Sequence, residues 1–103
     1  MAGSVIIDNR TAVAFSSRGF EIVTELTREV LKITDPDLIA IIFESLDGEC
    51  MPFISLDALS GRDVERFYVA TKKAFADWQQ HNPEPFSDWQ ELINRLETDQ
   101  RIN

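Results

Sequence analysis

The segment from Ser60 to the vicinity of His81 constrains the fold most, because its apolar residues recur at intervals of three and four. This spacing predicts a helix, and Ser60-Gly61-Arg62-Asp63 at its start resembles a capping box with a carboxylate in the first turn. The helix stops near His81, since Asn82-Pro83 and Pro85 cannot continue it. Its apolar stripe consists of Val64, Phe67, Tyr68, Thr71, Ala74, Phe75 and Trp78. Because such a stripe must be buried, the rest of the chain has to cover it.

Two other segments show the same helical periodicity. The residues from Phe20 to Ile33 predict an amphipathic helix that ends before Asp35-Pro36, with Ser17 available to cap its N-terminus. A last helix is predicted to begin at Ser87, which forms a second capping box with Gln90. We expect the tail, residues 98–103, to fray. The two apolar stripes are Ile22, Val23, Leu26, Val30 and Ile33 in the first helix and Trp89, Leu92, Ile93 and Leu96 in the second.

Two runs with β-strand character precede the helices. Residues 4–8 and 11–16 flank the turn-prone sequence Asp8-Asn9-Arg10. Their β-branched and aromatic residues are Val5, Ile6, Ile7, Val13 and Phe15. This pattern predicts a short N-terminal β-hairpin.

Residues 35–56 allow two interpretations. In the first, Asp35-Pro36 starts a helix, because aspartate offers an N-cap acceptor and proline has no N–H to lose. That helix would run from Leu38 to Leu46 and end at Gly48 in the left-handed conformation.

In the second interpretation, Leu38–Phe43 is a buried strand, and Asp47-Gly48 turns it into a partner strand from Cys50 to Leu56. Pro52 would then lie at an edge or a bulge. We favour the helix and keep a second hairpin at residues 38–56 as the alternative.

The length of 103 residues suits one hydrophobic core, so residues 1–103 are expected to form a single domain. The elements predict an α+β fold, mostly α, with the short N-terminal hairpin and three or four packed helices. The single cysteine, Cys50, excludes an internal disulfide, and with one histidine it cannot supply the ligands of a zinc finger. The first residues lack the features of a signal peptide, so a cytoplasmic location is expected.

The sequence contains no recognisable catalytic or cofactor motif. His81 lies at a helix end, where bonding to the last carbonyls is the ordinary role, and no G-x-S-x-G elbow accompanies it. The glycines match neither the Walker spacing nor G-x-G-x-x-G. Asp35-Pro36-Asp37 and Asp47-Gly48-Glu49 are only pairs of acids, too few for a calcium loop. We therefore predict no enzymatic activity, no cofactor and no metal.

The formal net charge is −8, with a pI near 4.5, so the chain as a whole repels nucleic acid and anionic membranes. Residues 35–57 carry six carboxylates and no lysine or arginine. Helix capping accounts for Asp35 and Asp37. The candidates for binding a basic protein are therefore Glu44, Asp47, Glu49 and Asp57. A second group, in which an aromatic residue lies beside acids as in many interfaces, is Glu84, Phe86 and Asp88.

The run from Pro52 to Phe75, PFISLDALSGRDVERFYVATKKAF, follows this acidic segment. In size, acidity and this run, the chain resembles the small immunity proteins of bacterial toxin systems, including those of contact-dependent growth inhibition. The resemblance implies a cytoplasmic protein that binds one cognate toxin domain, frequently a basic nuclease. It concerns general character, and it transfers no functional residue by position.

Together these observations predict a non-catalytic inhibitor that binds a basic toxin as a monomer, in a 1:1 complex. Its acidic surface would cover the active-site or substrate groove, and the field of the carboxylates would speed association. Two other classes remain open. One is a regulatory or adaptor module that binds an ordinary protein or self-associates, and the other is a small enzyme or metal-dependent hydrolase.

Overall fold

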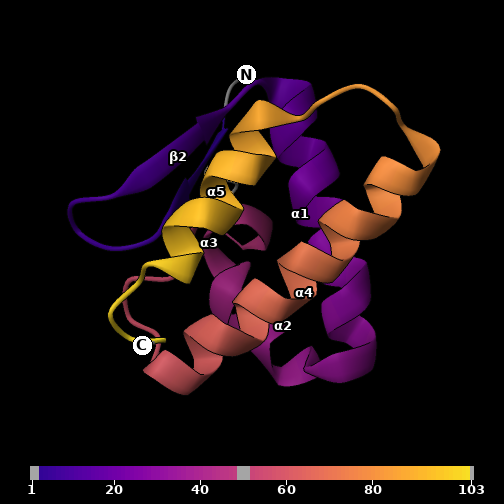
Figure 1. Ribbon diagram of the computed structural model, residues 1–103. Coiled ribbons are helices and arrows are strands. Elements are labelled where there is room, and N and C mark those ends of the chain that lie inside the picture. The colour runs from indigo at the N-terminus through magenta and orange to yellow at the C-terminus, as the bar shows by residue number, and fades with distance from the viewer. Residues whose placement is uncertain (1–2, 49–51, 103) are drawn as a thin grey trace.

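The computed structural model describes residues 3–48 and 52–102, and of Ser45 and Asp47 it describes the backbone alone. In chain order the elements are β1 (Gly3–Ile6), β2 (Ala12–Phe15), α1 (Ser17–Thr34), α2 (Pro36–Ile42), α3 (Glu44–Asp47), β3 (Phe53–Ser55), α4 (Gly61–His81) and α5 (Ser87–Glu97). Figure 1 shows the sheet at one side of the molecule, with α5 in front of it and α1 and α4 beside it. The predicted fold class, α+β and mostly α, is confirmed.

The sheet contains the predicted N-terminal hairpin, formed by β1 and β2, and a third strand, β3. β1 pairs antiparallel with β2, with Val5 opposite Val13, and the backbone N–H of Ile7 closes the turn by donating to the Thr11 carbonyl at 2.8 Å. β3 pairs parallel with β1 on the other side, with Val5 opposite Ile54, so the strand order is β2-β1-β3. The alternative of a second hairpin at residues 38–56 is wrong, because β3 satisfies its backbone on β1 and residues 36–42 are helical.

The helical interpretation of residues 35–48 is confirmed in kind and corrected in detail. The helix is interrupted at Phe43, whose φ of −96° and ψ of 7° separate α2 from α3. The Phe43 ring is fully buried, and the Arg28 guanidinium lies 4.5 Å from its centroid. Gly48 has φ −89° and ψ −39°, so the predicted left-handed cap is wrong. The chain turns at Gly48 in a conformation open to any residue.

Three helix starts test the capping predictions. Ser60 caps α4 as predicted, since its Oγ accepts from the backbone N–H of Asp63 at 3.3 Å. The cap of α1 is Ser16, one residue before the predicted Ser17, and its Oγ accepts from the N–H of Gly19 at 3.1 Å. The predicted box at Ser87 is wrong, because Ser87 is already helical and no side chain caps α5.

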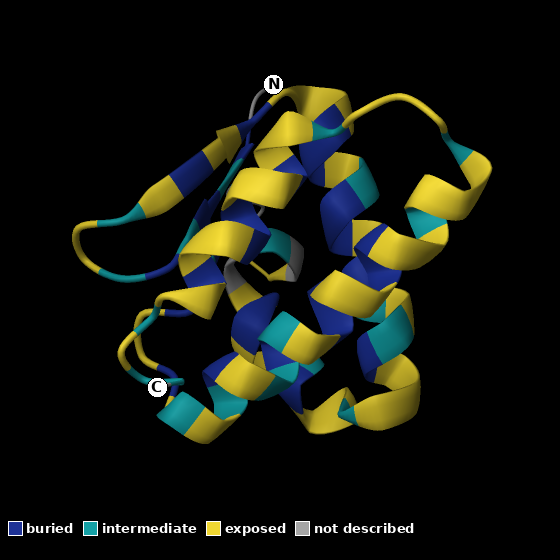
Figure 2. Cartoon of the chain, in the orientation of Figure 1, coloured by how far each residue is buried: buried dark blue, intermediate teal, exposed yellow. Residues whose placement is uncertain are grey.

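The core lies between α1, α4, α5 and the inner face of the sheet, where Figure 2 shows the buried residues. α1 packs along α4, and Thr27 on α1 hydrogen-bonds Thr71 on α4, with 3.0 Å between their hydroxyl oxygens. The Trp89 indole N–H of α5 donates to the same Thr71 oxygen at 2.9 Å. The buried face of α1 runs through Phe20, Val23, Thr27 and Leu31, so Ile33, predicted to be buried, lies off this face and is 86% exposed.

Candidate binding surface

The first predicted group of acids lies at the two ends of β3. Glu44 is the first residue of α3 and is exposed. Asp47 is the last residue of α3, and its side chain is not described, while Glu49 lies outside the described residues. α3 leads into the amino end of β3, whereas Asp57 follows its carboxyl end and is exposed. Of this group, the structure therefore describes the side chains of Glu44 and Asp57 alone.

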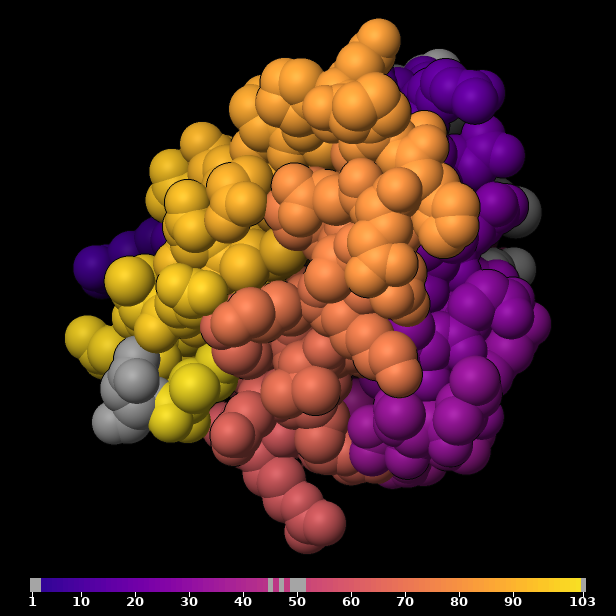
Figure 3. Space-filling view, turned by 45° about the vertical axis from the view of Figure 1, so that its right-hand side comes forward, coloured from indigo at the N-terminus to yellow at the C-terminus, as the bar shows by residue number. Residues whose placement is uncertain are grey.

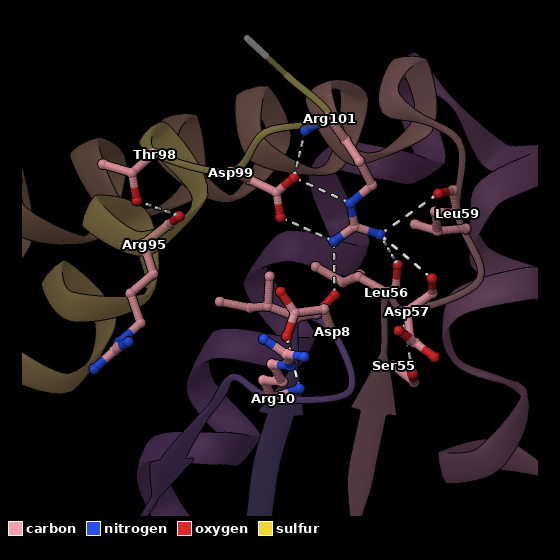
Figure 4. A network of polar contacts seen from close by, with 11 residues as sticks. Asp8, Arg10, Ser55, Leu56, Asp57, Leu59, Arg95, Thr98, Asp99 and Arg101 are labelled. Atoms are coloured by element: carbon pink, nitrogen blue, oxygen red, sulfur yellow. Dashed lines mark hydrogen bonds and ion pairs between the residues drawn. The ribbon is translucent and has the colours of Figure 1, made fainter.

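Asp57 lies beside a polar network centred on Arg101 (Figure 4). The Arg101 guanidinium donates to the carbonyl oxygens of Ile7 and Leu56, each at 2.7 Å. It also binds the Asp99 carboxylate, at 3.0 Å from Nε and 2.9 Å from Nη2. This hydrogen bonding is the main cause that holds the pKa of Asp99 below its ordinary value. The chain end is thereby fastened across β1 and the β3–α4 connection.

The backbone of Arg101 lies so close to the start of α4 that only glycine fits at position 61. A Cβ at Gly61 would overlap the backbone carbonyl oxygen of Arg101. Figure 1 shows the C-terminus beside the start of α4. The expectation that residues 98–103 fray concerns motion in solution, and it stays a prediction.

The second predicted group combines exposed acids with a largely packed aromatic ring. Glu84 and Asp88 are exposed on either side of the start of α5. Phe86 is partly buried, and its ring centroid lies 5.2 Å from that of Trp78 and 5.6 Å from that of Trp89. Trp89 is fully buried, as its stripe predicted. Phe86 thus packs the α4–α5 connector onto the core, and only part of its ring faces solvent.

Asp35 and Asp37 are engaged by Arg66 of α4. Arg66 Nε lies 2.7 Å from the Asp35 carboxylate and Nη2 lies 2.7 Å from that of Asp37, while Nη1 lies 2.8 Å from Asp63. Asp35 is the N-cap residue of α2, Pro36 follows it in the first turn and Asp37 lies there too, as predicted, but the Asp35 side chain makes no capping bond, so that part of the prediction is wrong. Hydrogen bonds that Arg66 donates to three carboxylates raise the pKa of Arg66, and the bond to Asp37 lowers the pKa of Asp37. One guanidinium thus ties the start of α2 to α4.

This pairing divides the acids of residues 35–57 into two classes. Two of the six are neutralised within the chain by Arg66. In contrast, no side chain in residues 3–48 and 52–102 makes a hydrogen bond or ion pair with the carboxylates of Glu44, Asp57, Glu84 or Asp88. Arg101 acts on Asp57 through its charge, but none of the four carboxylates is held in a hydrogen bond or ion pair by a described side chain.

The remaining sequence-based expectations concern metals, membranes and His81. Among the residues that the structure describes, no three metal-ligating side chains gather. No helix in this part of the chain has the length and apolar character to cross a bilayer. His81 is exposed, and its Nδ1 lies 3.1 Å from the Asp77 carbonyl oxygen, the helix-end contact that was predicted.

Sequence reasoning missed the two arginines that organise the polar surface. The position of Arg66 three residues after Asp63 is a signal for that pair, but nothing local indicates its contacts with α2. Arg101 was assigned to a fraying tail, and its acceptors lie 94 and 45 residues away in sequence. Both sites depend on contacts between distant segments, which a periodicity does not reveal.

Comparisons with known proteins find one informative likeness. No family model matches the sequence, and no curated protein matches it. Among solved structures, the chain is similar to the immunity protein in "CdiA-CT toxin from Burkholderia pseudomallei E479 in complex with cognate CdiI immunity protein". The TM-score is 0.91 and the identity 21%, over 98% of this chain and 99% of that chain. The two chains therefore share one fold over nearly their whole lengths.

Proposed function

We propose that this chain is a non-catalytic inhibitor, an immunity protein that neutralises a cognate toxin in the cytoplasm of the producing cell. The observation that carries the proposal is the structural similarity, over 98% of the chain, to the immunity protein of a toxin complex. Since one fold can host several functions, the chemistry of the surface has to support the same conclusion.

The surface supports binding to a basic protein. The net charge is −8, and no described side chain makes a hydrogen bond or ion pair with the carboxylates of Glu44, Asp57, Glu84 and Asp88. Asp47 and Glu49 add two acids to the same stretch as Glu44. Such a field attracts a cationic surface and raises the rate of encounter.

The mechanism is occlusion. A nuclease-type toxin needs a basic groove to hold its polyanionic substrate, because phosphate contacts supply most of the affinity for nucleic acid. An acidic inhibitor bound over that groove, one chain to one toxin domain, offers carboxylates where the phosphates would bind. Inhibition then requires no chemical step by the inhibitor.

The test is protection by the chain against the toxin domain encoded beside it. Cells that produce this toxin domain are expected to grow only when they also produce the chain, and the two proteins are expected to co-elute at 1:1. A matched control is the immunity protein of the E479 complex, which should not protect because it is only 21% identical. Growth arrest despite production of the folded chain, together with separate elution, would refute the proposal.

A further inference from the structure

The outward face of α4 lies opposite its buried stripe and carries an ordered set of exposed residues. Buried Val64, Phe67 and Thr71 define the inner side of the helix. With 3.6 residues per turn, the residues of the opposite side are Arg62, Glu65, Val69, Lys73 and Asp77, all of which are exposed. We name these five residues the α4 outer stripe. Figure 3 shows α4 crossing the middle of this face, between α5 and the α1–α2 segment.

The four charged residues of the α4 outer stripe make no hydrogen bond or ion pair with another side chain in the described ranges; they are Arg62, Glu65, Lys73 and Asp77. Arg62 acts on Asp37 through its charge alone, as a cause of the lowered pKa of Asp37 that ranks below the hydrogen bond from Arg66. Elsewhere on α4 the charges are engaged, since Arg66 binds three carboxylates and Lys72 lies 4.0 Å from Glu97. The α4 outer stripe thus presents alternating charges with unused pairing capacity.

The order of these charges is self-complementary about Val69. Glu65 and Lys73 each lie four residues from Val69, on opposite sides, and Arg62 and Asp77 lie seven and eight residues away. If a second α4 lies antiparallel with Val69 at the crossing point, Arg62 faces Asp77 of the second copy and Glu65 faces Lys73. The two-fold axis repeats both pairs, as in the interhelical salt bridges that set orientation in coiled coils.

Apolar side chains complete this face. Val69, at the centre of the pattern, is 58% exposed, and Ile33 of α1 is 86% exposed. Both line shallow hollows between α1 and α4, together with Val30 and Lys73, and the hollow at Val69 has a volume of about 360 Å³. Two of the three large hydrophobic residues exposed in the described chain therefore border neighbouring hollows that share Val30, Thr34 and Lys73, the arrangement of an interface with an apolar centre and a charged rim.

The charge balance identifies the occupant. The α4 outer stripe has two basic and two acidic residues, so it is neutral in a chain whose net charge is −8. A strongly basic toxin gains no net attraction there, whereas a second copy supplies the complementary charge at each position. From this geometry we infer that the chain forms an antiparallel two-fold dimer through the α4 outer stripe, with Ile33 and Val69 in the contact.

The inference is independent of the proposed function and modifies one expectation of the sequence analysis. The free protein would be a dimer at high concentration, where a monomer was expected. Each chain would keep its own acids for one toxin domain, because Glu44 and Asp57 lie on α3 and after β3, outside the α4 outer stripe. The contact is small, so we expect a dissociation constant of roughly 10 to 100 μM.

Sedimentation equilibrium of the full chain provides the test, from about 5 μM to about 1 mM, a range that brackets the expected constant. The weight-average mass is expected to rise from 11.8 kDa towards twice that value. Salt at 0.5 M should weaken association several-fold, because it screens the exposed ion pairs. A mass that stays at 11.8 kDa throughout would overturn the inference.

Substitutions test the register. Val69→Lys places two cations at the crossing point and is expected to leave only monomer, while Ile41→Lys, at a 54% exposed position on α2, should associate like the wild type. Arg62→Asp should abolish association and the double variant Arg62→Asp, Asp77→Arg should restore it. Circular dichroism checks that each variant is folded. Dimerisation of Val69→Lys, or failure of the double variant to recover, would contradict the antiparallel contact.

Discussion

Substitution of Arg101 tests whether the chain end is part of the folded structure. Arg101→Met keeps most of the side-chain stem and removes every guanidinium donor. The carbonyl groups of Ile7 and Leu56 then lose their 2.7 Å bonds to the guanidinium. Both residues are buried, with exposed fractions of 2% and 0%. The Asp99 carboxylate, only 6% exposed, loses its bonds to the guanidinium as well.

The size of the effect depends on which donors each acceptor keeps. The Leu56 carbonyl still accepts from the backbone N–H of Leu59 at 3.2 Å, and the Asp99 carboxylate still accepts from the backbone N–H of residue 101 at 2.8 Å. The buried Ile7 carbonyl loses its guanidinium donor, at a cost of about 1 to 3 kcal/mol, and the lost guanidinium bonds to Leu56 and Asp99 add to this. The Arg101 side chain is 24% exposed, so water can reach part of the vacated space. The free energy of unfolding should therefore fall by about 2 kcal/mol, which for a domain of this size lowers the melting temperature by roughly 8 to 16 °C.

The effect has a defined pH dependence. Hydrogen bonding by Arg101 holds the pKa of Asp99 below its ordinary value of 3.8 in the folded protein. A carboxyl group with a lowered folded-state pKa stabilises the fold above its unfolded pKa, and this contribution disappears as the pH falls through the folded-state pKa. The stability difference between wild type and Arg101→Met should thus be full at pH 7 and narrow below pH 3.8.

Urea unfolding followed by circular dichroism, at pH 7 and at pH 3, measures both quantities. Arg95→Met is the matched control, because Arg95 is 50% exposed and its Nε lies 3.7 Å from Glu91, so its loss should cost under ~0.5 kcal/mol. If Arg101→Met also changed the stability by less than ~0.5 kcal/mol at pH 7, Arg101 would not hold these acceptors. The fraying predicted from sequence would then describe the chain end.

Three further predictions concern the core, the Arg66 cluster and the candidate binding residues. Thr71→Val leaves a buried indole N–H and a buried hydroxyl without their shared partner, so urea unfolding should show a loss of about 2 kcal/mol, and an unchanged midpoint would contradict this contact. Arg66→Met should lower the melting temperature at pH 7, and the difference should shrink in acid as the pH falls through the lowered pKa of Asp37; a difference independent of pH would show that the ion pairs contribute nothing. Glu44→Gln combined with Asp57→Asn should slow association with the toxin domain several-fold at low salt and flatten its salt dependence, measured by stopped flow, and unchanged rates would place the contact elsewhere.

Local sequence was sufficient for the long helices. α4 begins at the predicted Ser60 cap and ends at His81, because the cap, the apolar stripe and the following prolines all act within a few residues. The hairpin was predictable for the same reason, since its turn and its strands are adjacent in the chain. The cap of α1 was displaced by one residue, from Ser17 to Ser16, because two successive serines offer the same side-chain oxygen.

Features that depend on distant partners were not predictable. β3 has only three residues, and its parallel pairing with β1 spans about half the chain, so no turn signal announces it. Ile33 fits the apolar spacing of its helix, yet the face of α1 that packs on the core includes Thr24 and Thr27 and leaves Ile33 exposed. Periodicity predicts that a helix has a buried face, and tertiary contacts decide which residues belong to it.

Some charged side chains of this chain are paired with one another and others are not, and the unpaired ones distinguish its two candidate interfaces. Arg66 forms ion pairs with two of the six acids of residues 35–57, so the field that meets a basic toxin comes from acids such as Glu44 and Asp57, which form no ion pair with a described side chain. The α4 outer stripe carries balanced charge and suits a second copy. Figure 1 shows α4 at the front of the molecule and α3 behind it. Neutralising Glu44 and Asp57 should therefore slow toxin binding and leave the dimer unchanged. Val69→Lys should abolish the dimer and leave toxin binding unchanged.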